Sequence, residues 1–475
     1  MIDVSKKPIH ICEHFMKKGH ELELCIEKMA IGGRAVAKHE GMVIFVDKAV
    51  AGDIVRAKIF KKKKKFAEAR TTEVIQPSSF RVHPICRYVD YCGGCKWQFI
   101  DYDQQVIFKQ QHVAEALEHI GHIESPNVYP TMPSPNIFEY RNKMEFSCAD
   151  RRWLMRSEME QNIDRSFALG LHVPGTFDKV LDIHQCEIQK KQGNAILSNV
   201  RQFMQSSGEP AYGLRSHEGF WRFCVLRHSH ANDQWMVNIV TSTDRPEILH
   251  QMATTICQKH PNIVSFMHQI SARKAAIAVG EREKCLQGKD YIEDNIGPFA
   301  FKIAANAFFQ TNTQAAVHLY DTVKSFARLK RSDVVWDLYC GTGTIAIWLA
   351  NSCASVCGIE SVADSIANAR QNCQTNNITN CHFICGDIKD HLKEQKEKPD
   401  VVIMDPPRAG THPKVISQLL AVSPQRIVYV SCNPSTMARD LGMLINHYEI
   451  TDVQPVDMFP HTFHIEAVVR LERKK

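Results

Sequence analysis

Val334-Val335-Trp336-Asp337-Leu338-Tyr339-Cys340-Gly341-Thr342-Gly343-Thr344 is an apolar strand that runs into a glycine turn, followed by a helix over 345–351. Glycines at such a turn let the chain bend tightly and let a ligand approach the backbone. Ala346 stands where the third glycine of a dinucleotide fingerprint would fall, which makes a dinucleotide less favoured. The stretch therefore predicts the first strand of a doubly wound sheet, with a nucleotide-type ligand at Gly341 and Gly343.

Strands and helices alternate from residue 306 onward. Besides 334–338, strands are expected at 355–359, 382–385, 401–404, 427–430, 449–456 and 465–471, and helical stretches such as 362–374 separate the first five strands. This alternation is typical of a parallel sheet with helices on both faces. Seven strands, the last two without a full helix between them, predict an α/β domain of the Rossmann-like class I methyltransferase type over 306–475.

Acidic residues follow three successive strands of this domain. Glu360, after the second strand, can accept hydrogen bonds from both hydroxyls of a ribose. Asp387, after the third, can accept one from an adenine amino group, and Asp405 follows the fourth. Each acid alone is more often a helix cap or a solvated surface group. Their shared position at strand ends favours S-adenosylmethionine as the ligand.

A cysteine ends the strand in Val-Tyr-Val-Ser-Cys-Asn-Pro, residues 428–434. A lone cysteine there is usually buried and inert. Cys432, however, should lie beside Asp405, which two following prolines hold in a stiff loop. A thiolate available near neutral pH suits addition to an electron-poor ring carbon. Arg408 stands where many amino-methyltransferases place an aromatic residue, which argues against methylation of an exocyclic amine.

Glu466 completes the groups that methylation of a pyrimidine at C5 requires. Cys432 would add to C6 of the ring, and Glu466 would remove the proton from C5 after methyl transfer. Asp405 would hold the ring through its imide edge. His461 or His464 are the alternative bases, since both lie in the same short segment.

Two further domains are expected before residue 306. Residues 21–75 alternate apolar and polar side chains between glycine turns, which predicts a small β-barrel. The lysine run Lys61–Lys65 between two of its strands favours an oligonucleotide-binding barrel, although a barrel used only for packing stays open. Residues 76–305 are interpreted as a mixed α+β domain, with a helix over 101–120 and a strand over Trp235–Thr241.

Seventeen cysteines are many for a chain of this length, and most are expected to be reduced core residues. Cys86-x5-Cys92-Gly-Gly-Cys95 instead has the spacing of metal ligands. A fourth ligand must come from elsewhere. This spacing fits either zinc or a [4Fe–4S] cluster.

Length and composition indicate an intracellular protein of several domains. The chain has 475 residues, 44% of them hydrophobic, and a formal net charge of +6. Two or three domains with sizeable cores are expected. We find no signal peptide and no stretch that approaches a membrane span, so we expect a cytoplasmic protein. No feature indicates an obligate protein partner.

These motifs together resemble the S-adenosylmethionine-dependent RNA uracil-5 methyltransferases, and most closely their iron–sulfur subgroup that acts on 23S ribosomal RNA. The resemblance spans nearly the whole chain, and its most specific segments are Ser431–Pro434, His461–Glu466 and Phe308–Asn312. It implies a TRAM domain over 14–75, Cys432 as nucleophile and Glu466 as general base. The implied cofactor contacts are Gln310, Tyr339, Gly341, Gly343, Thr344, Glu360, Asp387 and Asp405. The chain departs from the family pattern conservatively at Tyr339, Thr344 and Asp387.

The resemblance also implies Cys186 as the fourth thiolate and favours a [4Fe–4S] cluster with a structural role over zinc. It implies that the helix at 101–122 packs on the methyltransferase domain. The barrel and the cysteines together favour 23S ribosomal RNA over transfer RNA as substrate. Cytosine-5 methylation is less favoured because residues 405–410 contain no cysteine. A non-catalytic iron–sulfur RNA-binding protein is the remaining alternative.

Overall fold

The computed structural model describes residues 16–392 and 397–475, so residues 14 and 15 of the expected barrel lie outside the described residues. The chain divides into two compact units. One contains the residues up to Val82 together with Phe99–Asp101, and the other contains His83–Gln98 and Tyr102–Lys475. No helix in the described ranges is both long enough and apolar enough to cross a bilayer.

The first unit is a six-stranded sheet in the order β1-β5-β6-β4-β3-β2. Alternation builds it: along β5, Val55, Ala57 and Ile59 are buried while the residues between them are exposed. Lys61 and Lys62 belong to β5, so only the last three lysines of the run form the turn to β6. Its strands are β1 (Glu21–Cys25), β2 (Lys28–Met29), β3 (Ala35–His39), β4 (Met42–Asp47), β5 (Ile54–Lys62) and β6 (Phe66–Gln76).

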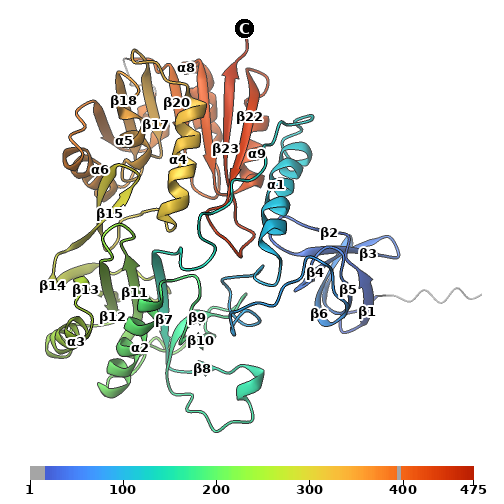
Figure 1. Cartoon of the computed structure of the whole chain (residues 1–475), viewed down its shortest axis with the longest axis vertical. Helices are drawn as coiled ribbons and strands as arrows, with labels where there is room; N and C mark the ends of the chain where they lie inside the picture. The colour runs from blue at the N-terminus through green and yellow to red at the C-terminus, as the bar shows by residue number, and fades with distance from the viewer. Residues whose placement is uncertain (1–15, 393–396) are drawn as a thin grey trace, which may run out of the picture. The chain divides into compact units, whose positions relative to one another are not determined.

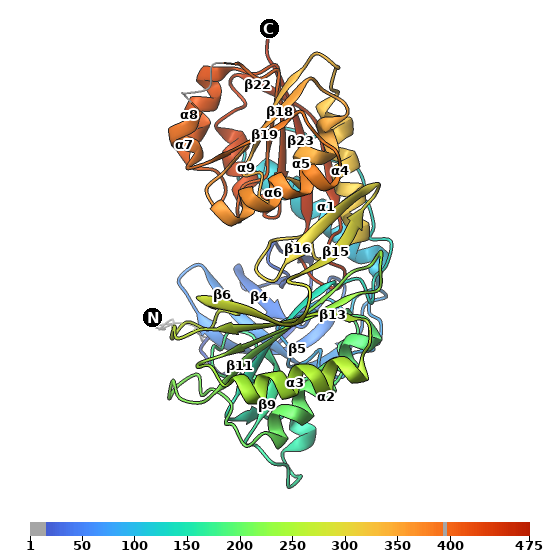
Figure 2. The same cartoon turned by 90° about the vertical axis from the view of Figure 1, so that its left-hand side faces the viewer.

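The second unit contains an eight-stranded mixed sheet in the order β14-β13-β12-β11-β7-β9-β10-β8. Helices α2 (Lys191–Ser206) and α3 (Pro246–Lys259) pack on this sheet (Figure 2). The strand predicted at Trp235–Thr241 is β12. The other strands are β7 (Lys143–Ala149), β8 (Arg152–Trp153), β9 (Ala168–His172), β10 (Val180–Asp182), β11 (Trp221–His228), β13 (Ile263–Ile270) and β14 (Arg282–Gly288).

A hairpin of β15 (Tyr291–Ile296) and β16 (Phe299–Ala304) leads into the seven-stranded sheet that the sequence predicts. Its order is β19-β18-β17-β20-β21-β23-β22, with only β23 antiparallel to its neighbours. The strands are β17 (Val334–Leu338), β18 (Ser355–Glu360), β19 (Cys381–Cys385), β20 (Val401–Met404), β21 (Arg426–Ser431), β22 (Tyr448–Val456) and β23 (Glu466–Arg473). This is the α/β methyltransferase fold.

Alternating side chains send this sheet's apolar residues to two separate cores. Along β20, Val401 and Ile403 join one core, and Val402 and Met404 join the other. The first core is covered by α4 (Thr313–Ala327), α5 (Thr344–Ala350) and α6 (Ala363–Thr375). The second is covered by α7 (Ile388–His391), α8 (Pro413–Val422) and α9 (Pro434–Gly442), together with α1 (Tyr102–His119). Helix α1 lies beside α9 and β22, although it precedes the central sheet in the chain (Figure 1).

Candidate active site

The glycine turn after β17 has the backbone shape that a ligand loop requires. Tyr339, Gly341 and Gly343 all have positive φ angles, of 64°, 52° and 77°. A Cβ on Gly343 would lie 3.0 Å from the Phe383 ring, so a side chain there would be both strained and crowded. Gly343 also begins α5. The turn therefore presents backbone amides at the carboxyl edge of the sheet.

Glu360 and Asp387 stand at the neighbouring strand ends but differ in what they bind. One carboxylate oxygen of Glu360 accepts the backbone N–H groups of Ser361 (2.7 Å) and Val362 (3.0 Å). Asp387 caps α7 through the N–H of Lys389 and forms an ion pair of 2.7 Å with the Lys389 ammonium. Asp387 therefore already serves as a helix cap, and a bound adenine would compete with Lys389 for it.

Two carboxyl groups lie behind this turn: Asp337 is buried and Asp405 is half-buried. Burial raises the pKa of Asp405 to about 6. Burial, together with Asp405 and Glu360, raises the pKa of Asp337 to about 8, with the Ala346 amide opposing the shift. Among the described residues, neither oxygen of Asp337 has a hydrogen bond of normal geometry. A cation bound here would restore the ionised form of these groups.

Gln310 reaches the same region from the segment before α4. Its backbone carbonyl accepts a 2.8 Å hydrogen bond from the Asn142 side-chain amide. Its side chain and the Thr344 hydroxyl both hydrogen-bond the buried Tyr320 phenol, and the Tyr320–Thr344 distance is 2.9 Å. Gln310 and Thr344 are thereby brought together beside Asp405, whose charge raises the pKa of Tyr320 further.

Strand register places Cys432 opposite Glu466. Strands β21 and β23 are antiparallel, and Ser431 pairs with Ala467, so the next residue of one faces the previous residue of the other. Burial, followed by the charges of Glu466 and Asp405, raises the pKa of the Cys432 thiol to about 11, and Arg408 opposes the shift. The protein groups around Cys432 therefore disfavour the thiolate near neutral pH.

Glu466 is more deeply buried than Cys432. Its exposed fraction is 6%, and burial together with Asp405 raises its pKa well above the usual value. Arg408 again opposes the shift. The Arg408 backbone carbonyl accepts hydrogen bonds from the Asn433 amide (3.0 Å) and the Thr436 hydroxyl (3.2 Å). The loops that follow β20 and β21 are therefore fastened to each other.

Helix α1 anchors the start of the loop between β22 and β23. The Lys109 ammonium and the Asp457 carboxylate are both fully buried and form an ion pair of 2.6 Å. Lys109 also donates to the Phe459 carbonyl at 3.1 Å, and the Tyr102 hydroxyl donates to Asp457 at 2.9 Å. A buried ion pair is costly unless its remaining hydrogen bonds are satisfied, as they are here. The chain ahead of Glu466 is thus fixed by a helix from far upstream.

The two histidines of this loop are engaged elsewhere. The His461 N–H donates to the Gln105 side-chain carbonyl at 2.9 Å, and its carbonyl accepts from the Trp97 N–H at 2.9 Å. The ring of His461 stacks on Phe138 at 4.4 Å. Burial lowers the pKa of both His461 and His464 to about 4, so both rings are neutral and weakly basic at pH 7. Glu466 is the group that faces the thiol.

The four predicted metal ligands are gathered at one place. Burial and the other three thiols raise the pKa of Cys95 well above its usual value, and burial raises that of Cys186 to about 12 and of Cys92 to about 11. The Gly94 N–H points to the Cys92 sulfur at 3.4 Å. Within residues 16–392 and 397–475, however, no three His, Cys, Asp or Glu side chains converge as ligands of a single metal ion.

Sequence reasoning missed several residues of the site. Asp337 lies within the strand 334–338. An acidic residue in an otherwise apolar strand, next to a ligand turn, could have been recognised from the sequence. Arg408 was used only to exclude one reaction, whereas it is the cation that faces both Cys432 and Glu466. Lys109 and Asp457 are 348 residues apart, and no local pattern joins them.

Comparisons with known proteins agree with this geometry. Residues 250–474 match the family model described as tRNA (Uracil-5-)-methyltransferase, and residues 16–72 match the TRAM domain. The chain is 40% identical to an uncharacterized RNA methyltransferase of Chlorobaculum tepidum over 98% of this chain and 99% of that protein. It is also 40% identical to one of Bacteroides thetaiotaomicron, over 94% of this chain and 100% of the relative.

A solved structure supports the same assignment. The tRNA (uracil-54, C5)-methyltransferase of Pyrococcus abyssi, in complex with S-adenosyl-L-homocysteine, superposes with a TM-score of 0.73 at 28% identity. The match covers 95% of this chain and 100% of that one. A nearby positive charge would stabilise the ionised form of the carboxyl groups at the glycine turn. They therefore fit the positively charged sulfonium of the methyl donor that such enzymes use. The chain belongs to the S-adenosylmethionine-dependent RNA (uracil-5-)-methyltransferases that carry an N-terminal TRAM domain.

Proposed function

We propose that this enzyme methylates C5 of a uridine through a covalent bond between Cys432 and C6 of the ring. The observation that carries the proposal is the register of β21 and β23, which sets a buried carboxyl group opposite the thiol. The C5 proton must leave on the side chain nearest the bonded ring. Glu466 is that side chain, while His461 is occupied by Gln105 and Phe138.

The proposed reaction uses Cys432, Glu466 and Asp405 in separate steps. The Cys432 thiolate forms the S–C6 bond, and the C5=C6 π electrons move toward C5 and the O4 carbonyl. S-adenosylmethionine would supply the electrophilic methyl group that C5 accepts, leaving as the neutral thioether S-adenosylhomocysteine. The Glu466 carboxylate then takes the C5 proton, the C5=C6 bond re-forms, and the S–C6 bond breaks with its electrons returning to sulfur. Asp405 holds the ring through its imide N–H.

Electrostatics explains how the thiol becomes reactive. Burial and the neighbouring acids favour the neutral forms of Cys432 and Glu466, whereas Asp405, with a pKa of about 6, is mostly ionised at pH 7. A cation bound at the glycine turn favours all three ionised forms. Gln310, Tyr339, Thr344, Glu360 and Asp387 are the remaining side chains proposed to hold that ligand. Reactivity is thereby linked to occupancy of the cofactor site.

We expect two variants to separate the roles of the thiol and the carboxylate. Cys432→Ala should abolish turnover while S-adenosylmethionine still binds, because the thiol adds to RNA and not to the cofactor. Glu466→Gln should accumulate a covalent protein–RNA adduct, because the ring can be methylated but not deprotonated. Denaturing gels with labelled RNA measure the adduct, and Cys385→Ala, an exposed cysteine, is the matched control. A fully active Cys432→Ala enzyme would refute the mechanism.

The RNA target that we propose is 23S ribosomal RNA. The presence of both this cysteine set and a TRAM domain in one chain supports it, through the resemblance to the ribosomal subgroup. Transfer RNA is the second candidate, because the Pyrococcus abyssi relative is a tRNA (uracil-54, C5)-methyltransferase. Mass spectrometry of ribosomal and transfer RNA from a strain lacking the gene decides between them. Loss of 5-methyluridine should be confined to one RNA, and loss from transfer RNA alone would refute the first choice.

Cys86, Cys92, Cys95 and Cys186 are proposed to hold a [4Fe–4S] cluster. Four gathered and half-buried thiols support a site of this kind. Thiolates around one zinc ion stand only about 3.8 Å apart, given zinc–sulfur bonds of about 2.3 Å in a tetrahedron. A [4Fe–4S] cubane, whose corners alternate iron and sulfide, takes one thiolate on each of its irons and so accepts wider spacing than a single zinc ion. The cluster would tie the loop carrying Cys86–Cys95 to β10.

Colour tests the cluster directly. Protein purified without oxygen should be brown, with a broad absorption band near about 400 nm. Cys95→Ser should bleach it, whereas Cys148→Ser, a buried cysteine of the central core, should leave the band unchanged. A colourless protein that contains stoichiometric zinc would contradict the proposal. Absorbance and metal analysis report this result independently of methylation.

A further inference from the structure

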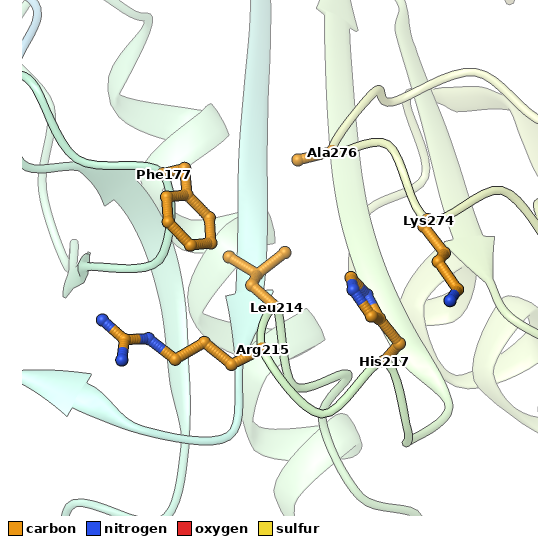
Figure 3. Close-up of a pocket in the computed structure, with 6 residues that line it drawn as sticks. All are labelled: Phe177, Leu214, Arg215, His217, Lys274 and Ala276. Atoms are coloured by element: carbon orange, nitrogen blue, oxygen red, sulfur yellow. The ribbon is translucent and has the colours of Figure 1, made fainter.

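An open cavity of about 550 Å³ lies in the central sheet domain (Figure 3), and no residue of the glycine turn lines it. Three loops meet there: one between β9 and β10, one before β11, and one between β13 and β14. Figure 3 shows an aromatic ring on one side and cationic side chains on both. The lining residues are Phe177, Leu214, Arg215, His217, Lys274 and Ala276.

A buried arginine fixes two of the three walls. The Arg222 guanidinium, 2% exposed, donates to the carbonyl oxygens of Ser271 (2.6 Å), Arg273 (2.6 Å) and Ala275 (3.0 Å). It also lies over the Tyr212 ring, at 4.3 Å from the ring centroid. One side chain therefore holds the loop before β11 and the loop after β13 at a set distance. The cavity is preformed by these bonds.

The lining combines an exposed aromatic face with positive charge. Phe177 is 63% exposed, which is unusual for a phenylalanine that has no partner to cover it. Arg215 is held by Asp178 at 2.5 Å and keeps most of its side chain in solvent. Lys274 has no ion pair or hydrogen bond among the residues that the structure describes. Leu214 gives the cavity an apolar floor.

We propose that this cavity binds one unstacked nucleotide of the RNA, with its base on Phe177 and its phosphate at Lys274 and Arg215. The inference rests on the proposed function, because it needs an RNA substrate. Proteins read single-stranded RNA by stacking splayed bases on aromatic rings and pairing phosphates with cations. An acidic protein segment would satisfy the cations but would leave the exposed ring unused. The volume also suits a nucleotide-sized ligand.

This site is separate from the site of methyl transfer. The cavity lies at the start of β11, whereas Arg227 at the other end of that strand donates to the Ala305 carbonyl ahead of the methyltransferase sheet. Eight residues of strand span roughly 23 Å. The bound nucleotide is therefore several positions away from the target uridine. It strengthens the binding of long RNA and leaves a short RNA around the target unaffected.

Binding of two RNAs by the full-length protein tests the site. The probes are a labelled single-stranded uridine-rich RNA of about 20 nucleotides and one of about five, measured by fluorescence anisotropy with S-adenosylhomocysteine present. Phe177→Ala should weaken the long RNA about 5- to 100-fold, as loss of one base stack predicts. The same variant should bind the short RNA like the wild type. Phe177→Tyr, which keeps the ring, should retain the affinity.

Salt dependence tests the phosphate contact. Lys274→Ala should lower the slope of log affinity against log salt by about one, and Lys191→Ala, an exposed lysine of α2, should not change it. If Phe177→Ala bound and methylated the long RNA like the wild type, the inference would fall while the proposed function stood. If wild-type protein bound neither RNA, both would fall. Displacement of the long RNA by poly-glutamate from the wild type but not from Lys274→Ala would assign the cavity to an acidic protein instead.

Discussion

At the scale of single residues, the site is built from acids that folding makes harder to ionise. Asp405 titrates near 6 and Asp337 near 8, both above the ordinary aspartate value of about 3.9. Their contribution to the free energy of unfolding is therefore greatest below about pH 4. It falls as the pH rises through about 6 for Asp405 and about 8 for Asp337. A bound cation offsets the loss of stability that ionisation of these carboxyl groups causes.

The affinity for S-adenosylmethionine should depend on the ionisation of Asp405 and Asp337. Between pH 6 and pH 8 the affinity for S-adenosylmethionine should rise roughly tenfold relative to that for S-adenosylhomocysteine, which lacks the sulfonium charge. Asp337→Asn should remove most of this rise, because the amide cannot ionise. Calorimetric titration with both ligands at several pH values measures the ratio. A ratio that does not change with pH would show that these carboxyl groups do not respond to the sulfonium.

At the scale of elements, α1 controls the loop that leads to Glu466. Lys109, Gln105 and Tyr102 on this helix contact Asp457, Phe459 and His461 of the loop. These contacts come from outside the methyltransferase sheet. The position of the proposed base therefore depends on a helix that its own domain does not supply.

We predict that Lys109→Met destabilises the protein by about 3–5 kcal/mol, because Asp457 is left buried without a partner. The double variant Lys109→Met with Asp457→Leu should recover most of that stability, since apolar pairs replace buried ion pairs well. Its methylation rate should stay low, because the bonds to Phe459 are still missing. Urea unfolding and single-turnover methylation measure the two effects. A double variant with wild-type turnover would exclude a positioning role.

The local sequence pattern predicted the strands of the methyltransferase sheet. It did not predict the contacts between residues that lie far apart in the sequence. The run at 401–404 is wholly apolar, and the run at 334–338 is apolar except for Asp337, because both faces of the sheet are covered; the two runs coincide with β20 and β17. The pairing of Cys432 with Glu466 depends on the register of β21 and β23, which no spacing in the sequence encodes. The raised pKa of Cys432 likewise follows from burial and from neighbours on other strands.

At the scale of the whole molecule, the TRAM domain is a separate compact unit with its own apolar core. Leu24, Ile44, Val55 and Ile59 are buried inside it. Arg81, from the end of the unit, forms a 2.8 Å ion pair with the buried Asp53. This unit can therefore contribute RNA affinity without taking part in the chemistry.

The lysine turn of that unit should contribute to RNA binding through charge alone. Changing Lys63, Lys64 and Lys65 together to Ala should lower the slope of log affinity against log salt by about two, as three phosphate contacts on a single strand predict. The affinity for S-adenosylmethionine should not change. Lys61 is left in place because it pairs with Glu68 at 2.8 Å. An unchanged salt slope would assign this turn to packing or solvent.

The route of the chain through α1 has a consequence for synthesis. The apolar side of α1, with Val113 and Leu117, is finally covered only by strands and helices near the far end of the chain. The ion-pair partner of Lys109, Asp457, is synthesised 348 residues later. At about 5–20 residues per second, that delay on the ribosome is roughly 17–70 seconds. A nascent chain of this protein must therefore carry an unburied helix for most of its translation, which makes it a natural client for chaperones that shield such surfaces.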